Sequence, residues 1–205
     1  MPAVLIRLQL LKRSIISNRT ADTANGGKMS SDKIKKLTMM GMLTALVMLL
    51  QMVVHIKFGI FSMSTVLIPI VVGAALYGVL AGAWLGLVFA LAVFLSGDAA
   101  FFLGINMAGT IITVTAKGIA CGAAAGLIYK MLKRKNEKAA VIAASITCPV
   151  VNTGVFIIGC LIFFSYDMKY ILTAFVGVNF LVELIANAVL SSTIMFLIKR
   201  GKGRN

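Results

Sequence analysis

The chain has 205 residues, of which 60% are hydrophobic and 13% charged, and its formal net charge is +14. A soluble domain carries about 25% charged residues, so this composition excludes an ordinary soluble enzyme or binding domain. Apolar runs long enough to span a membrane follow residue 36 and indicate an all-α integral membrane protein embedded in lipid. The positive charge does not indicate a nucleic-acid-binding protein, because the basic residues flank the apolar runs.

The N-terminal segment differs from the rest of the chain. Residues 1–28 combine a short basic amphipathic stretch with the loose segment ADTANGGK, and they lack the order of a signal peptide. They could lie on the membrane surface, or translation could start at Met29, and the second interpretation is favoured. We expect a basic N-terminal extension at 1–32, poorly ordered or a mis-assigned start, a transmembrane domain at 33–200 and a basic cytoplasmic tail at 201–205.

The apolar runs predict the membrane spans. The second run is too long for a single span, and we expect two short helices that turn near 76–82, where Gly78 and Gly82 permit a tight turn. This interpretation gives six spans, whereas one long helix would give five. The runs lie at about 37–56, 64–95, 100–130, 139–165 and 171–198.

The distribution of positive charge favours six spans. Residues 1–36, 130–138 and 199–205 hold 8, 5 and 4 of the 20 Lys and Arg residues. Six spans place these three segments on one side of the membrane, whereas five spans split them between the two sides. The positive-inside rule therefore predicts a six-transmembrane-helix bundle with both termini cytoplasmic. The outer loops are then short and rich in aromatic residues, at 54–64, 96–104 and 164–170.

The sequence contains no pattern that predicts catalysis or a cofactor. There is no nucleophile–base pair, no Gly-rich phosphate loop and no pair of acids at catalytic spacing. The single histidine, His55, cannot build a metal site alone. Cys121, Cys148 and Cys160 lie inside apolar runs, so we expect small buried residues and neither a disulfide framework nor a metal site.

Two ionisable residues, Lys117 and Glu183, lie inside predicted spans. A lysine at the centre of a spanning helix costs about 2.5–3.5 kcal/mol, and intramembrane charges are functional candidates by default. Polar residues accompany both charges at helical spacing. They are Asn106, Thr110 and Thr113 on the fourth helix, Asn179 and Asn187 on the sixth, and Asn152 and Thr153 after Pro149 on the fifth.

These polar residues lie at similar predicted depths. Lys117, Asn152 and Glu183 are each about 12–13 residues from the outer ends of their helices, or roughly 18–20 Å. One interpretation is a Lys117–Glu183 ion pair that only holds the bundle together. The other is a pocket, open to the outside beneath the aromatic loops, that hydrogen-bonds a small polar molecule. The row of asparagines and threonines favours the pocket.

Small residues at intervals of four predict close helix contacts. Gly118, Gly122 and Gly126 on the fourth helix are expected to pack inside the bundle. Gly41 and Ala45 on the first helix could pack inside the bundle or against a different subunit.

Several segments together resemble the substrate-binding S component of energy-coupling factor (ECF) vitamin transporters. They are the basic start KIKKLTMMGMLTALVML, the segment IPIVVGAALYGVLAGAWLGLVFAL, the basic loop after the fourth helix and PVVNTGVFIIG. The resemblance covers about residues 33–200. It implies a multi-pass protein of the bacterial cytoplasmic membrane that binds a vitamin from outside and associates with a transmembrane coupling subunit and two ATPase subunits.

The resemblance also implies roles for particular residues. Gly41 and Ala45 match the family's small-residue motif, which faces the coupling subunit, with Gly in place of the usual first Ala. The family's pocket lies among helices four to six, where the polar residues fall. Lys117 could pair with a carboxylate, so pantothenate is the preferred substrate, with riboflavin or folate next. The alternatives are a self-sufficient ion-coupled carrier that uses Lys117 and Glu183, and a membrane assembly protein.

Overall fold

The computed structural model describes residue 13 and residues 33–53, 57–58, 61–62, 65–164 and 178–202, and within these it leaves out the side chains of 57–58, 61–62, 178–179, 182 and 197–202. The N-terminal extension expected at 1–32 thus lies almost entirely outside the described residues. The chain divides into two units, Met1–Gly41 and Met42–Asn205.

The described chain is almost entirely helical, as predicted. A helix covers Lys33–Val53. In chain order there follow β1 (Lys57–Phe58), β2 (Phe61–Ser62), α2 (Leu67–Tyr77), α3 (Val79–Leu95), α4 (Ala100–Ile105), α5 (Met107–Leu132), α6 (Glu137–Phe163) and α8 (Val178–Lys202). The two-residue strands β1 and β2 pair antiparallel within the segment that we expected to be an irregular outer loop.

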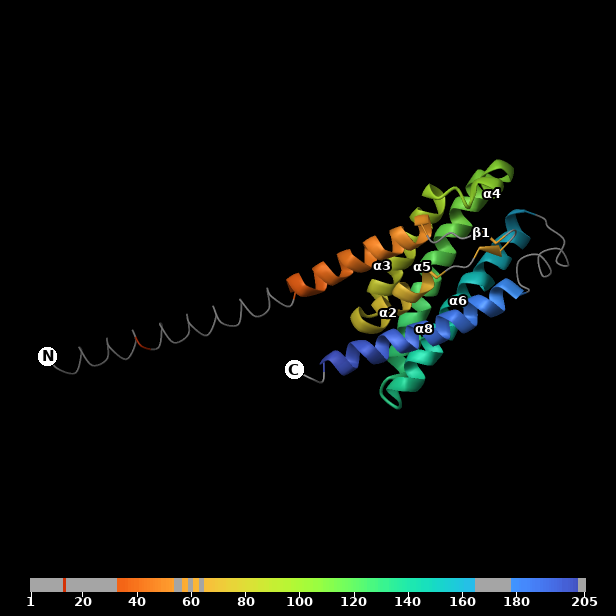
Figure 1. The fold of residues 1–205 in the computed structure, drawn as a ribbon. Helices are drawn as coiled ribbons and strands as arrows, with labels where there is room; N and C mark the ends of the chain where they lie inside the picture. The colour runs from red at the N-terminus through yellow and green to blue at the C-terminus, as the bar shows by residue number, and fades with distance from the viewer. Residues whose placement is uncertain are drawn as a thin grey trace, which may run out of the picture. The chain divides into compact units, whose positions relative to one another are not determined.

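The helices α3, α5, α6 and α8 form the body of the second unit. Helix α5 packs against α3 on one side and α6 on the other, and α8 packs against α6. Figure 1 shows α8 running beside α6. The buried core is made largely by α2, α3 and α5, with Leu67, Ile70 and Leu85 among its largest fully buried side chains.

Three helices of the described chain are long and apolar enough to cross a membrane: Lys33–Val53, α5 and α6. Helices α2 and α3 and the segment Glu183–Phe196 are apolar but shorter. At 1.5 Å per residue, the 11 residues of α2 extend about 17 Å, well short of a hydrocarbon core of about 30 Å. The three long apolar helices indicate an integral membrane protein. The total of six spans stays a prediction.

The turn expected in the second apolar run is present. Helix α2 ends and α3 begins at Gly78, whose φ of 93° lies in the left-handed region that glycine adopts without a steric penalty. The role expected for Gly82 was wrong, because Gly82 lies inside α3 and makes no part of the turn. A Cβ atom at Gly82 would collide with the carbonyl oxygen of Gly122.

Glycines form the contact between α3 and α5. Gly82 faces Gly122, and Gly86 faces Gly118, so closely that a Cβ on any of the four would overlap backbone atoms of the other helix. A Cβ on Gly126 would lie 2.8 Å from the Cα of Val79. The predicted packing of Gly118, Gly122 and Gly126 inside the bundle is therefore confirmed. In lipid, close backbone approach of this kind replaces the hydrophobic driving force.

Within the apolar run at 100–130, Asn106 was expected to lie on the polar face of the fourth helix, and this prediction was wrong. Asn106 has extended backbone angles (φ −147°, ψ 96°) and divides the segment into α4 and α5. Its side chain accepts a hydrogen bond from the Gly109 amide at 2.9 Å, the N-cap arrangement that asparagine favours. Asn106 thus begins a helix and does not continue the polar face of one.

Candidate substrate-binding site

Lys117 lies on α5 between two aromatic rings. Its Nζ is 4.9 Å from the ring centroid of Phe156 on α6 and 5.7 Å from that of Phe89 on α3. Cation–π contacts stabilise a desolvated ammonium by about 2 kcal/mol or more. The two rings therefore offset a large part of the cost of placing a lysine inside the membrane.

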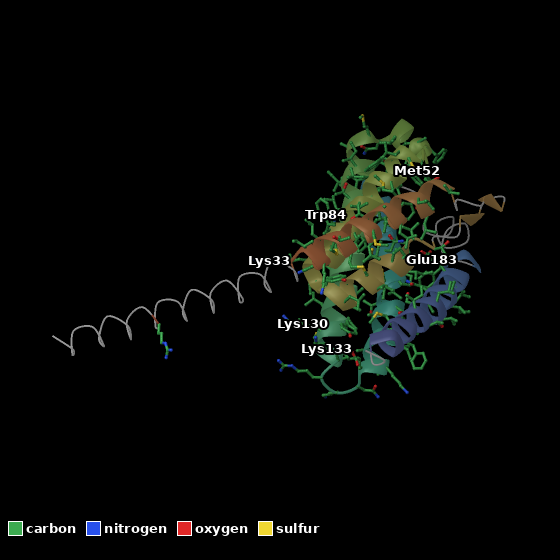
Figure 2. The ribbon with its side chains drawn as sticks, turned by 60° about the vertical axis from the view of Figure 1, so that its left-hand side comes forward. Lys33, Met52, Trp84, Lys130, Lys133 and Glu183 are labelled. Carbon is green, nitrogen blue, oxygen red and sulfur yellow. The ribbon has the colours of Figure 1, made fainter. Side chains whose placement is uncertain are left out.

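Glu183 lies on α8 and is buried (Figure 2). It is near enough to Lys117 for the two charges to attract each other. The described residues show no direct ion pair or hydrogen bond between the two side chains, and Glu183 Oε1 has no hydrogen-bond partner among them. A closed ion pair of the kind that would only hold the helices together is thus not formed.

Four buried polar atoms of the predicted site have no hydrogen-bond partner among the described residues. They come from the three helices α5, α6 and α8: Thr113 Oγ1, Asn152 Oδ1, Glu183 Oε1 and Asn187 Nδ2. Buried polar groups are nearly always paired, and each one left unpaired costs about 1–3 kcal/mol. The remaining such atom of the described chain, Ser192 Oγ, also lies on α8. A bound polar molecule could form hydrogen bonds with these unpaired donors and acceptors.

The contacts that the individual residues already make show which of their polar atoms remain available to a bound molecule. Asn187 Oδ1 accepts a hydrogen bond from Ser191 Oγ at 2.8 Å, which leaves its Nδ2 group as the unpaired donor. Thr113 lies where α5 contacts α6, because a Cβ on Gly159 would meet its side chain. Thr153 is half-buried next to Asn152, and adjacent helical residues do not share a face.

Asn106 stands apart from this group. Asn106 accepts from Gly109 and donates to the carbonyl oxygen of Phe163 at 3.2 Å, so its amide is already used by backbone groups. Thr110 Oγ1 donates to the Asn106 carbonyl oxygen at 2.7 Å. The side chain of Asn179 lies outside the described residues.

An aromatic cluster adjoins Lys117 at the α4 end of the bundle. The ring of Phe102 in α4 lies edge-on to Phe156 of α6 at a centroid distance of 5.4 Å and to Phe164, the residue after α6, at 5.3 Å. It also lies edge-on to Phe101 at 5.4 Å. Phe156 is shared between this cluster and Lys117. Sequence reasoning did not find Phe156, although it follows Asn152 by four residues and therefore lies on the same helix face.

A second contact missed from the sequence joins the end of the first helix to the turn before α4. Gln51 Nε2 donates to Asp98 Oδ2 at 2.5 Å, and Ser96 Oγ donates to the same oxygen at 2.9 Å. Asp98 is also within electrostatic range of Lys117. This part-buried network links the end of the first helix to the turn that precedes α4.

The first helix leaves most of its apolar surface uncovered by the described chain. Gly41 and Ala45 are both exposed. Met42 and Leu49 on the same helix are 65% and 55% exposed. Trp84 of α3 contacts the same helix, and its Nε1 donates a hydrogen bond to Thr44 Oγ1 at 3.3 Å.

The arrangement is that of a helical membrane protein with a buried polar site. The family model for the ECF transporter, substrate-specific component, matches residues 35–198. The match covers most of the chain, so the protein belongs to this family, as the resemblance predicted. No curated protein and no solved structure matches the chain.

Family membership defines the class of protein. Members are the substrate-binding subunits of ECF importers, and they associate with a module of transmembrane coupling and ATPase subunits. The family is one of transporters and not of enzymes.

Proposed function

We propose that this protein is the high-affinity substrate-binding subunit of an ATP-driven ECF importer for a water-soluble vitamin in the bacterial cytoplasmic membrane. Pantothenate is the preferred substrate, with riboflavin and folate next. The observation that carries the proposal is a set of four buried polar atoms on α5, α6 and α8 that have no hydrogen-bond partner among the described residues, together with the Lys117 cation.

The chemistry of these groups favours a substrate with one anionic group and several hydroxyl or amide groups. Lys117 binds a carboxylate, since it is the cation of the site. Asn152 Oδ1 and Glu183 Oε1 accept hydrogen bonds from hydroxyl or amide N–H groups, and Asn187 Nδ2 donates one. Thr113 can do either. Pantothenate carries one carboxylate, two hydroxyls and one amide, which matches this inventory, whereas riboflavin has no carboxylate.

The other residues of the predicted site take outer positions in the proposal. We include Thr153 and Asn179 as further contacts to the substrate. Asn106 contacts the substrate only if it releases the Phe163 carbonyl oxygen, which it binds in the present structure. The aromatic cluster around Phe102 covers the site from outside.

The topology and the assembly follow from the same proposal. Six spans place both termini and the basic loop 130–138 in the cytoplasm. The coupling subunit packs against Gly41 and Ala45, whose small side chains allow close backbone approach. Two ATPase subunits bind the coupling subunit and supply the energy. No cofactor, metal ion or nucleic acid takes part.

Mass spectrometry of small molecules retained by the detergent-purified protein tests the proposal. We expect one vitamin to co-purify and to bind again, without ATP, after its removal. Uptake into liposomes should require the coupling and ATPase subunits. Uptake by this protein alone, driven by a proton or sodium gradient, would instead establish the ion-coupled carrier.

A further inference from the structure

A polar cavity lies at the opposite end of α5 from Asn106. It is a cavity of about 900 Å³ between the end of α2, the last turns of α5 and the start of the following loop. The proposed vitamin site does not include it. The polar residues that line it are Tyr77, Tyr129, Lys130, Lys133 and Arg134.

Charge and aromatic character combine in this cavity. Tyr129 is only 6% exposed, and its hydroxyl donates to Glu137 Oε1 at 3.0 Å. Lys133 Nζ lies 5.9 Å from the centroid of the Tyr129 ring. Lys130 and Arg134 are exposed. Three cations thus border the cavity, and the neighbouring carboxylate of Glu137 is already engaged by the tyrosine.

The cavity lies at the end of a spanning helix. Lys130 is in the last turn of α5, one of the three helices able to cross a membrane. Figure 2 shows Lys130 and Lys133 together at one end of the bundle, away from Glu183. The apolar wall includes Leu127 and Met131, which are 49% and 66% exposed. Basic and tyrosine side chains next to exposed apolar side chains are expected at the membrane interface, where the lipid headgroups meet the acyl chains.

We propose that this cavity binds the headgroup of an anionic phospholipid. The Arg134 guanidinium and the Lys130 and Lys133 ammonium groups bind the phosphate, and the acyl chains lie along Leu127 and Met131. Free phosphate offers the same oxygen atoms but no acyl chains. The exposed apolar wall next to the cations therefore favours a lipid as the source of the phosphate.

Native mass spectrometry of the full-length protein with added phosphatidylglycerol or phosphatidylcholine of identical acyl chains tests the proposal. We expect tighter binding of phosphatidylglycerol. The variant Lys130→Gln/Arg134→Gln should weaken that binding about 30-fold, since each of the two lost contacts to the phosphate lowers the affinity about fivefold. The matched control Lys135→Gln/Lys138→Gln removes the same charge from the loop after α5 and the start of α6, outside the cavity lining, and should retain most of the affinity.

Three results would overturn the proposal. The first is equal binding of the two lipids by the unaltered protein, which requires no variant. The second is an equal loss in the cavity variant and the control, which would indicate general attraction to a basic loop. The third is complete displacement of phosphatidylglycerol by millimolar inorganic phosphate, which would make the cavity a site for the free anion.

Discussion

Replacing Gly122 by alanine tests the close contact between α3 and α5. A Cβ at this position would lie 2.6 Å from the carbonyl carbon of Gly82 and 3.2 Å from Ile70 Cγ2, and it would overlap the Gly82 carbonyl oxygen. Carbon atoms in contact are normally about 3.5–4.0 Å apart. Two of the three obstructing atoms belong to the backbone, so relief requires the helices to separate by about 1 Å.

The expected change in the free energy of unfolding is the sum of two opposing contributions. Overpacking of this kind costs about 1–3 kcal/mol. Alanine regains about 1 kcal/mol, because glycine is the poorer helix former. We therefore expect Gly122→Ala to lower the free energy of unfolding by up to about 2 kcal/mol, measured by titration with sodium dodecyl sulfate in mixed micelles.

Gly154 on α6 supplies the matched control. A Cβ at Gly154 meets no heavy atom within 4 Å among the described residues. Gly154→Ala should thus be neutral or stabilising by up to about 1 kcal/mol. If Gly122→Ala proved as stable as Gly154→Ala, the glycine contact between α3 and α5 would be refuted.

Three further variants address the site and the assembly. Glu183→Gln keeps the shape but removes the charge, so we expect weaker vitamin binding by calorimetry, and unchanged affinity would show that Glu183 does not contact the substrate. Phe156→Leu should weaken binding about tenfold because Lys117 loses a ring contact, whereas the control Phe101→Leu, away from Lys117, should not. Ala45→Leu should retain vitamin binding but prevent co-purification with the coupling subunit, whereas Gly41→Ala should assemble, and normal assembly of Ala45→Leu would contradict the interface.

The parts of the fold that depend on local chemistry could be predicted from the sequence. Glycine at residue 78 marked the turn in the long apolar run because it alone tolerates the required φ. The spacing of Gly118, Gly122 and Gly126 marked a helix contact. Asn106 was misread because an asparagine can lie on a polar helix face or cap a helix, and only the tertiary structure decides between them.

The candidate site could be predicted from the sequence only in part, for a similar reason. The polar residues stood out in apolar runs, and four of them each prove to hold a buried polar atom that has no hydrogen-bond partner among the described residues. The rings beside Lys117 did not stand out, because phenylalanine in a membrane helix is ordinary. Phe89 belongs to a helix distant in sequence, and its position depends on how α3 packs against α5.

The most direct test of the account is calorimetric titration of the purified protein with its vitamin, in the absence of ATP, comparing Lys117→Gln with the control Lys135→Gln. Lys135 is exposed in the loop after α5. Loss of one partner of a buried charged hydrogen bond costs about 2–5 kcal/mol, so Lys117→Gln should weaken binding at least about 30-fold while the control binds normally. Equal affinities would show that Lys117 does not contact the substrate and would contradict the proposed site.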